Sequence, residues 1–219
     1  MRIEILTDGQ KKLLDFIRQY KRNYYLVGGT AIALQLGHRQ SIDFDLFTSS
    51  KIKRLAIKKD AGAFGVPFNL LTESADQIHF VMNGVKITFF SYPYEVGHPV
   101  QFDNVITMPT LLSLAAMKAF ALGRRAKWKD YVDLYFLLRD KFSIGEISHE
   151  ANRIFSDSFS ARLFREQLSF HKDIDYSEEV DYMPGFAVEA ETVKAFLIDK
   201  ALEGVVSPDI TSGGYKCQI

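Results

Sequence analysis

Apolar and polar positions in the first part of the chain switch between helical and strand spacing. Apolar side chains recur within residues 10–21 at the spacing of an amphipathic helix, at Leu13, Leu14, Ile17 and Tyr20. A short apolar and aromatic run at residues 23–27 is typical of a buried strand. Residues 31–36 then favour a helix, which Gly37 can end as a C-cap. The pattern therefore predicts helix, strand and helix in that order.

Strand patterns dominate from there to about residue 108. Residues 41–47 alternate polar and apolar side chains, which predicts a strand that presents carboxylates on one face. Residues 51–62 predict a basic helix. The Asn83-Gly84 pair separates two apolar runs and strongly indicates a β-hairpin. Further strands are predicted at residues 67–71, 77–82, 85–92 and 105–109.

The pattern becomes helical after residue 108. Helices are predicted at residues 110–122, 127–139 and 189–203, with more helix between the last two. Pro109 can open the first of them, because proline suits the start of a helix. The last residues contain proline, serine and glycine, which are typical of a loose tail. We expect an α/β domain at residues 1–108, a helical domain at 109–206 and a flexible tail at 207–219.

Composition and charge narrow the class of protein. With 219 residues, of which 47% are apolar, the chain can bury a hydrophobic core, so wholesale disorder is excluded. Basic and acidic residues number 27 each, which argues against a protein that coats nucleic acid through bulk charge. The single cysteine, Cys217, excludes an intrachain disulfide and a cysteine-rich zinc site. We expect a cytoplasmic protein without a signal peptide or a membrane span.

A glycine turn and a pair of carboxylates carry the chemistry of the first half. Gly28-Gly29-Thr30 stands where a predicted strand runs into a helix, so backbone N–H groups there can bind a phosphate. Asp43 and Asp45 are two residues apart on the next predicted strand, so both carboxylates should leave the same face. Such carboxylates repel each other unless a divalent cation lies between them, which favours a Mg²⁺ site. Taken alone, a Gly-Gly pair is more often a simple turn and an Asp-x-Asp strand an exposed polar face.

The two motifs together resemble the nucleotidyltransferase superfamily. The resemblance rests on residues 25–31 (YLVGGTA) and 38–47 (HRQSIDFDLF). More narrowly, they are similar to the AbiEii/AbiGii toxins of bacterial abortive-infection and toxin–antitoxin systems. That family has Gly-Gly-(Thr/Ser), Arg-x-Ser-x-Asp-hydrophobic-Asp, a helix with a lysine, and a helix with Arg/Lys-Asp-x-x-Asp-Leu. The resemblance reaches about residue 140 and implies a nucleotidyltransferase-fold mixed sheet with flanking helices, followed by a helical domain that closes over the nucleotide.

The helical half contains the later motifs of that family. Lys118 lies within one predicted helix, and Asp130 and Asp133 share one face of the next because they are three residues apart. The resemblance implies that Lys118 and Asp133 face the nucleotide, with Asp130 as a further candidate. The residues alone also fit a solvated lysine and two carboxylates that offset the helix dipole.

The residues before the acidic strand have open roles. Arg39 could bind a phosphate or pair with a motif carboxylate, and Ser41 belongs with it to the implied nucleotide site. Thr30 could cap its helix or bond a phosphate oxygen. His38 is predicted to be a loop residue without a role.

One position departs from the superfamily pattern. Many members carry a third carboxylate on a neighbouring strand, where this chain has Thr88 or Lys86. The nearest acidic residues are Asp76 before the hairpin and Glu95 after it. The departure is consistent with a single metal ion, with a carboxylate supplied by Asp130 or Asp133, or with an inactive relative.

The resemblance implies an enzyme that moves a nucleotidyl group from an NTP to an acceptor hydroxyl. Asp43 and Asp45 would hold Mg²⁺ or Mn²⁺, and the acceptor would be an RNA end, such as tRNA, or a protein. The biological role would be that of a toxin with a separately encoded antitoxin. Two alternatives remain at this stage: a binding module that has lost catalysis, and a γ-phosphoryl transferase on the same scaffold.

Overall fold

A seven-stranded mixed sheet organises the first half of the chain in the computed structural model, which describes residues 1–204. Its strand order is β3-β4-β5-β2-β1-β7-β6. The strands are β1 (Tyr25–Val27), β2 (Phe44–Thr48), β3 (Phe68–Glu73), β4 (Gln77–Met82), β5 (Val85–Ser91), β6 (Val100–Phe102) and β7 (Ile106–Met108). The pairs β2/β5 and β1/β7 are parallel and the others are antiparallel. The predicted mixed sheet is therefore confirmed, although β6 was not foreseen.

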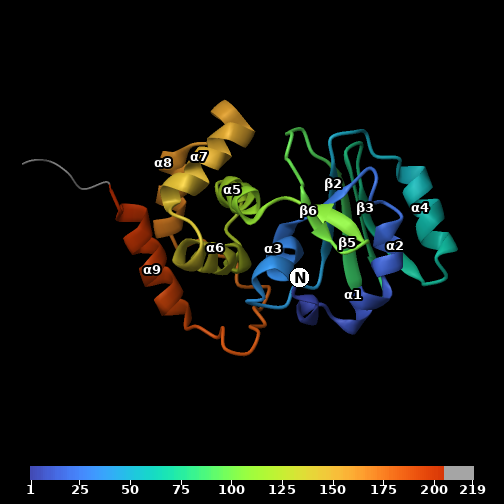
Figure 1. Ribbon diagram of the computed structural model, residues 1–219, viewed down its shortest axis with the longest axis horizontal. Helices are drawn as coiled ribbons and strands as arrows, with labels where there is room; N and C mark the ends of the chain where they lie inside the picture. The colour runs from blue at the N-terminus through green and yellow to red at the C-terminus, as the bar shows by residue number, and fades with distance from the viewer. Residues whose placement is uncertain (205–219) are drawn as a thin grey trace, which may run out of the picture.

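Helices from the N-terminal part cover one face of this sheet (Figure 1). They are α1 (Asp8–Lys12), α2 (Leu14–Arg18) and α4 (Arg54–Ala63). Aromatic side chains form the contact: the Phe16 ring lies 6.2 Å from that of Phe80, and the Tyr20 ring lies 4.6 Å from that of Phe89. The single helix predicted at residues 10–21 was wrong in its bounds. A capping box between Thr7 and Gln10 starts α1 earlier, and the chain turns at Leu13 before α2 begins.

The hairpin between β4 and β5 was predicted correctly. Asn83 and Gly84 both have positive φ, at 51° and 74°, as a two-residue turn of the right twist requires. The pairing runs from Gln77 opposite Phe90 to Met82 opposite Val85. This register places the side chains of Gln77 and His79 on the face of the sheet opposite to that covered by α2, because neighbours in a strand alternate.

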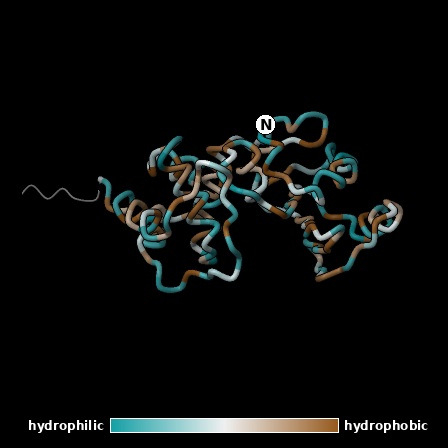
Figure 2. The backbone as a smooth tube through the Cα atoms, turned by 90° about the horizontal axis from the view of Figure 1, so that it is seen from below, coloured by the Kyte–Doolittle hydropathy of each residue, from teal (hydrophilic) through white to brown (hydrophobic). Residues whose placement is uncertain are grey.

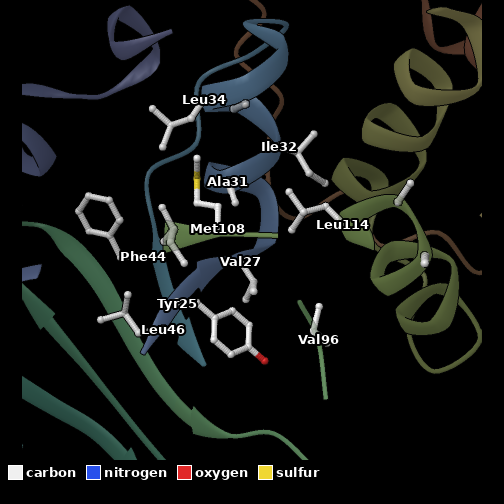
Figure 3. Close-up of a cluster of buried hydrophobic side chains, with 14 of the residues drawn as sticks. Tyr25, Val27, Ala31, Ile32, Leu34, Phe44, Leu46, Val96, Met108 and Leu114 are labelled. Atoms are coloured by element: carbon white, nitrogen blue, oxygen red, sulfur yellow. The ribbon is translucent and has the colours of Figure 1, made fainter. Parts of the chain in front are cut away.

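Helix α3 (Gly28–Leu36) joins the sheet to the helical half. Its buried Ala31 and Ile32 pack in a cluster with Val27, Met108 and Leu114 (Figure 3). The helix starts at Gly28, three residues earlier than predicted, so both glycines of the Gly-Gly pair lie in its first turn. It ends at Gly37, which adopts φ 79° as expected for a C-cap.

The second half of the described chain is helical (Figures 1 and 2). Its helices are α5 (Leu111–Leu122), α6 (Trp128–Asp140), α7 (Ile144–Phe155), α8 (Ala161–Ser169) and α9 (Ala190–Leu202), with a short 3₁₀ turn at Ser156–Ser158. Thr110 caps α5 by accepting a hydrogen bond from the Ser113 N–H, and Phe120 of α5 stacks on Phe155 of α7 at 3.9 Å. None of the helices in residues 1–204 is long and apolar enough to cross a membrane. The predicted tail, 207–219, lies outside the described residues.

Candidate active site

A cleft of about 390 Å³ lies between the free face of the sheet and helix α5. Three of the predicted site residues, Gly28, Asp45 and Lys118, line it. They come from the start of α3, from β2 and from α5, so both halves of the chain build the cleft. Arginines after α5 and polar side chains from the hairpin complete its charged rim, namely Arg124, Arg125, Lys86, Thr88, His79 and Gln77.

Asp45 lies on the central strands of the sheet, whereas Asp43 lies just outside them and is not among the residues that line the cleft. Asp45 lies in β2, opposite Val27 of β1 and Thr88 of β5. Asp43 lies just before β2, so the strand predicted from residue 41 began too early. The Asp43 carbonyl oxygen accepts hydrogen bonds from the side chains of Thr30 and Gln10 and is therefore not paired with a neighbouring strand. Burial raises the pKa of Asp43, and the nearby Asp45 carboxylate raises it further. The effect of Asp45 has the sign expected for repulsion between two like charges.

These carboxylates suit a magnesium ion. Mg²⁺ accepts one or two carboxylates and completes its shell with water and substrate phosphates. Within residues 1–204, no group of three or more His, Cys, Asp or Glu side chains is placed to hold a metal. Thr88, not a carboxylate, stands opposite Asp45 in the register of β5. The donor set fits a site that needs phosphate oxygens to complete it.

Gly28 and Gly29 allow close approach of two functional side chains. Gly28 has φ 73°, and a Cβ there would overlap a carboxylate oxygen of Asp45. At Gly29 a Cβ would overlap the guanidinium of Arg39. No side chain caps the start of α3, so its first N–H groups have no side-chain acceptor. The turn therefore presents backbone donors at the edge of the cleft, beside Asp45.

Asp133 forms the centre of a buried charge cluster behind the cleft. Its carboxylate accepts hydrogen bonds from Arg39 Nε at 2.7 Å and Nη2 at 2.9 Å, and its Oδ1 lies 2.7 Å from His38 Nε2. Lys118 Nζ lies 2.9 Å from its second oxygen. Asp133 has no exposed side-chain surface. Burial alone would raise its pKa, but Arg39 and Lys118 outweigh burial and hold the pKa well below its ordinary value.

Lys118 links this cluster to the cleft. It forms ion pairs with both Asp130 and Asp133, and Arg125 Nε donates to Asp130 at 3.0 Å. Burial would lower the pKa of Lys118, yet the two carboxylates keep it raised, so the ammonium stays charged. Because Lys118 also lines the cleft, its charge is held at a fixed place in the cleft wall.

The structure distinguishes the predicted site residues by position. Thr30 is buried, and its hydroxyl lies 2.9 Å from Ser41 Oγ, so both hydroxyls serve to position the loop before Asp43. The Arg39 guanidinium donates two hydrogen bonds to Asp133, so of its two predicted roles it has that of pairing with a motif carboxylate. Asp130 and Asp133 are both paired with basic groups.

Sequence reasoning placed His38 in a loop correctly but missed its contact with Asp133, beside which its side chain is fully buried. Only its place next to Arg39 could have signalled this. It also missed that residues 181–183 hold the same loop: the Gln40 N–H donates to the Asp181 carbonyl at 2.8 Å, and the Met183 N–H donates to the His38 carbonyl at 3.1 Å.

Burial of His38 predicts a loss of stability in mild acid. Burial lowers the pKa of His38, and the charges of Arg39 and Lys118 lower it further, although Asp133 acts in the opposite sense. As the pH falls below about 6.5, the unfolded chain binds a proton at this residue while the folded imidazole stays neutral, so unfolding is favoured. Until the folded imidazole itself titrates, the free energy of unfolding should fall by up to about 1.4 kcal/mol per pH unit through His38 alone.

Urea unfolding between pH 7.5 and 5.0 measures this effect in the wild type and in His38→Gln. Glutamine can still donate to Asp133 but does not titrate, so the variant should lose less stability over this range. Equal pH slopes in the two proteins would contradict the assignment.

Comparison with known proteins identifies a family whose model matches this chain. The family model described as nucleotidyl transferase AbiEii toxin, Type IV TA system, matches residues 83–203, which is more than half of the chain. The match includes Lys118, Asp130 and Asp133 but begins after the Gly-Gly and Asp-x-Asp motifs. An uncharacterized protein of Aquifex aeolicus (strain VF5) is 34% identical over 121 residues, covering 53% of this chain and 58% of that protein. The chain thus matches less than two thirds of that relative's length.

Solved structures share the fold at low sequence identity. MenT4, a nucleotidyltransferase toxin from Mycobacterium tuberculosis, superposes with a TM-score of 0.54 at 13% identity, covering 88% of this chain and 80% of MenT4. JHP933 from Helicobacter pylori gives a TM-score of 0.53 at 15% identity, covering 90% and 91% of the two chains. At such identities the likeness establishes the fold alone.

Proposed function

The chain belongs to the AbiEii nucleotidyltransferase toxin family, and we propose that it transfers a nucleotidyl group from an NTP to an acceptor hydroxyl. The acceptor would be an RNA end, such as tRNA, or a protein. The role would be that of a toxin whose growth inhibition a separately encoded antitoxin restrains.

One observation carries the proposal. Asp45, the Gly28 turn and the charged Lys118 line a single cleft, although they come from three separate elements. A carboxylate, backbone N–H donors and a fixed cation are the groups that phosphoryl transfer requires around a triphosphate.

Each of these groups has a defined task in the transfer. Asp43 and Asp45 would hold Mg²⁺ or Mn²⁺, which when bound would neutralise phosphate charge and polarise the α-phosphoryl group. Backbone N–H groups of Gly28 and Gly29 would bind phosphate oxygens, and the Lys118 ammonium would stabilise charge on the leaving group. The acceptor oxygen forms a bond to the α-phosphorus, the bond to the β-phosphate breaks, pyrophosphate leaves, and the hydroxyl proton passes to solvent.

A specific observation also supports a second candidate, a nucleotide-binding module without turnover. Thr88 stands opposite Asp45, where many members of the superfamily have a third carboxylate. A module of this kind would bind nucleotide but release no pyrophosphate.

The test is an incubation with each α-³²P-labelled NTP, Mg²⁺, and total bacterial RNA and protein. Label should pass to one class of acceptor with the wild type. We expect the loss of both carboxylates in Asp43→Ala/Asp45→Ala to lower transfer by at least about 1000-fold, because no ligand for the cation remains. Asp15→Ala, an exposed carboxylate on α2, is the matched control and should transfer label normally.

Product analysis separates the candidates. Nucleotide binding without any transfer would favour the binding module. Transfer of label from γ-³²P-NTP, with release of a nucleoside diphosphate, would identify a γ-phosphoryl transferase and contradict the proposal.

A further inference from the structure

A row of hydrogen-bonded polar side chains crosses the cleft floor beyond the carboxylates. His79 Nδ1 lies 3.0 Å from Thr88 Oγ1, and His79 Nε2 lies 3.0 Å from Gln77 Oε1. The register sets Thr88 beside Asp45 and His79 beside Thr88. From the sequence, Thr88 was expected to face the site, but Gln77 and His79 had no predicted role. Gln77, His79 and Thr88 nevertheless line the same cleft as Asp45.

The direction of these hydrogen bonds follows from the chemistry of the atoms. Burial lowers the pKa of His79, and Lys86 lowers it further, so the imidazole is neutral with one N–H. The Gln77 carbonyl oxygen can only accept, so Nε2–H donates to it and Nδ1 accepts from the Thr88 hydroxyl. The amide NH₂ of Gln77 then keeps two donors that have no partner among residues 1–204. Gln77 is half-buried and lines the cleft, so a ligand in the cleft can reach this amide.

Apolar side chains form the walls of this part of the cleft. Phe47 and Phe90, 5.2 Å apart, are half-buried on the sheet side, and half-buried Met117 lies on the side of α5. Buried Phe120 of α5 supports this wall from behind, because its ring is stacked on Phe155 and covered by the Arg124 guanidinium. Half-buried aromatic and apolar surfaces on opposite walls suit a flat aromatic ring between them. This chemistry differs from that of the other end of the cleft, where Asp45, Gly28 and Lys118 lie.

Sheet geometry relates the two ends. Gln77 lies two strands from Asp45, or ~10 Å at the spacing of neighbouring strands. It pairs with Phe90, two residues beyond Thr88, which adds a displacement of ~7 Å along the strands. A nucleotide whose α-phosphate lies at Asp45 can span the resulting ~12 Å with its sugar and base.

We propose that the half of the cleft between Phe90 and Met117 binds the nucleobase of the NTP, and that the Gln77 NH₂ donates to a keto oxygen of that base. The proposal rests on the proposed function, because it assumes an NTP at Asp45. In this proposal the Gln77 amide determines which base is bound, and the hydrogen bond from His79 to the Gln77 carbonyl oxygen fixes the orientation of that amide. The protein should therefore prefer UTP and GTP, which carry a keto group at pyrimidine position 4 or purine position 6, over CTP and ATP, which carry an amino group there.

Gln77→Glu tests this assignment directly. One carboxylate oxygen can still accept from His79, and the other then presents an acceptor where the wild type presents donors. We expect the wild type to bind UTP or GTP about tenfold more tightly than CTP or ATP, and the variant to reverse that preference by a similar factor. Binding is measured by calorimetry with non-hydrolysable analogues of all four NTPs in Mg²⁺. The ratios of kcat/KM for label transfer give a second readout.

Gln101→Glu is the matched control, because it makes the same change on β6 at the other edge of the sheet and should leave every ratio unchanged. If Gln77→Glu bound each of the four analogues as tightly as the wild type does, the base assignment would be overturned and the proposed function would stand. An amino-base preference in the wild type would also overturn it. Failure of the folded wild type to bind any analogue would overturn both the assignment and the proposed function.

Discussion

Replacing Asp133 with alanine is expected to lower the free energy of unfolding by about 3–5 kcal/mol, the range for breaking a buried ion pair by removing one partner. The Asp133 carboxylate is the sole carboxylate that the Arg39 guanidinium contacts in residues 1–204. Both side chains are almost entirely removed from solvent. The variant would therefore leave a guanidinium charge in the interior with only the Gln40 carbonyl to bond. Lys118 would keep Asp130 but lose its second carboxylate.

Urea or thermal unfolding followed by circular dichroism measures this loss. Asp140→Ala is the control, because Asp140 ends the same helix and its ion pair with Arg139 is more than one third exposed. Exposed pairs contribute about 0–1 kcal/mol, so the control should unfold close to the wild type. A stability of Asp133→Ala within 1 kcal/mol of the wild type would show that the cluster does not hold the two halves of the site together.

Local signals were sufficient for most strands of the sheet and for the hairpin turn, although not for β6 or the strand order. Asn83-Gly84 specifies its turn through two positive φ angles, and Gly37 ends α3 in the same way. Alternation also placed the carboxylate of Asp45 on the cleft face, where β1 and β5 pair with β2. These features depend on neighbours in the sequence or on one hydrogen-bonding pattern, and a single chain encodes them directly.

The partners of the buried charges could not be predicted in this way. His38 and Arg39 meet Asp133 across 95 and 94 positions of sequence, and the pairing depends on how α6 packs against the loop before β2. The sequence allowed Arg39 either a phosphate or a carboxylate partner, and only tertiary structure decides between them. Tertiary structure also explains why Gln77 and His79 were not predicted as site residues. Their place beside Asp45 follows from the strand order β4-β5-β2, in which the parallel β2/β5 pairing joins segments about forty residues apart.

Gly28→Ala is expected to lower kcat for nucleotidyl transfer by about 100-fold, the effect of displacing a catalytic group by about 1 Å. The Cβ would occupy the space of an Asp45 carboxylate oxygen, and the Asp45 Cγ would lie 3.2 Å from it. Asp45 can make room for this Cβ only by moving its carboxylate from its present place in the cleft. The positive φ of Gly28 adds about 1–2 kcal/mol of backbone strain for alanine. The same substitution therefore acts on the carboxylate and on the N–H groups of the turn.

Gly62→Ala separates this effect from a general loss of stability. Gly62 lies within α4, and a Cβ there would meet only a Phe68 ring carbon at an ordinary 3.9 Å. Alanine favours a helix over glycine, so this control should be as active as the wild type and more stable by about 0.5–1 kcal/mol. Steady-state transfer and thermal unfolding should be measured together on all three proteins. If Gly28→Ala remained folded and transferred label at the wild-type rate, the Asp45 carboxylate would tolerate displacement, and the carboxylate pair would not hold the reacting phosphate as proposed. A folded variant with a 100-fold lower kcat would instead show that the missing Cβ of Gly28 keeps the carboxylate in its reactive position.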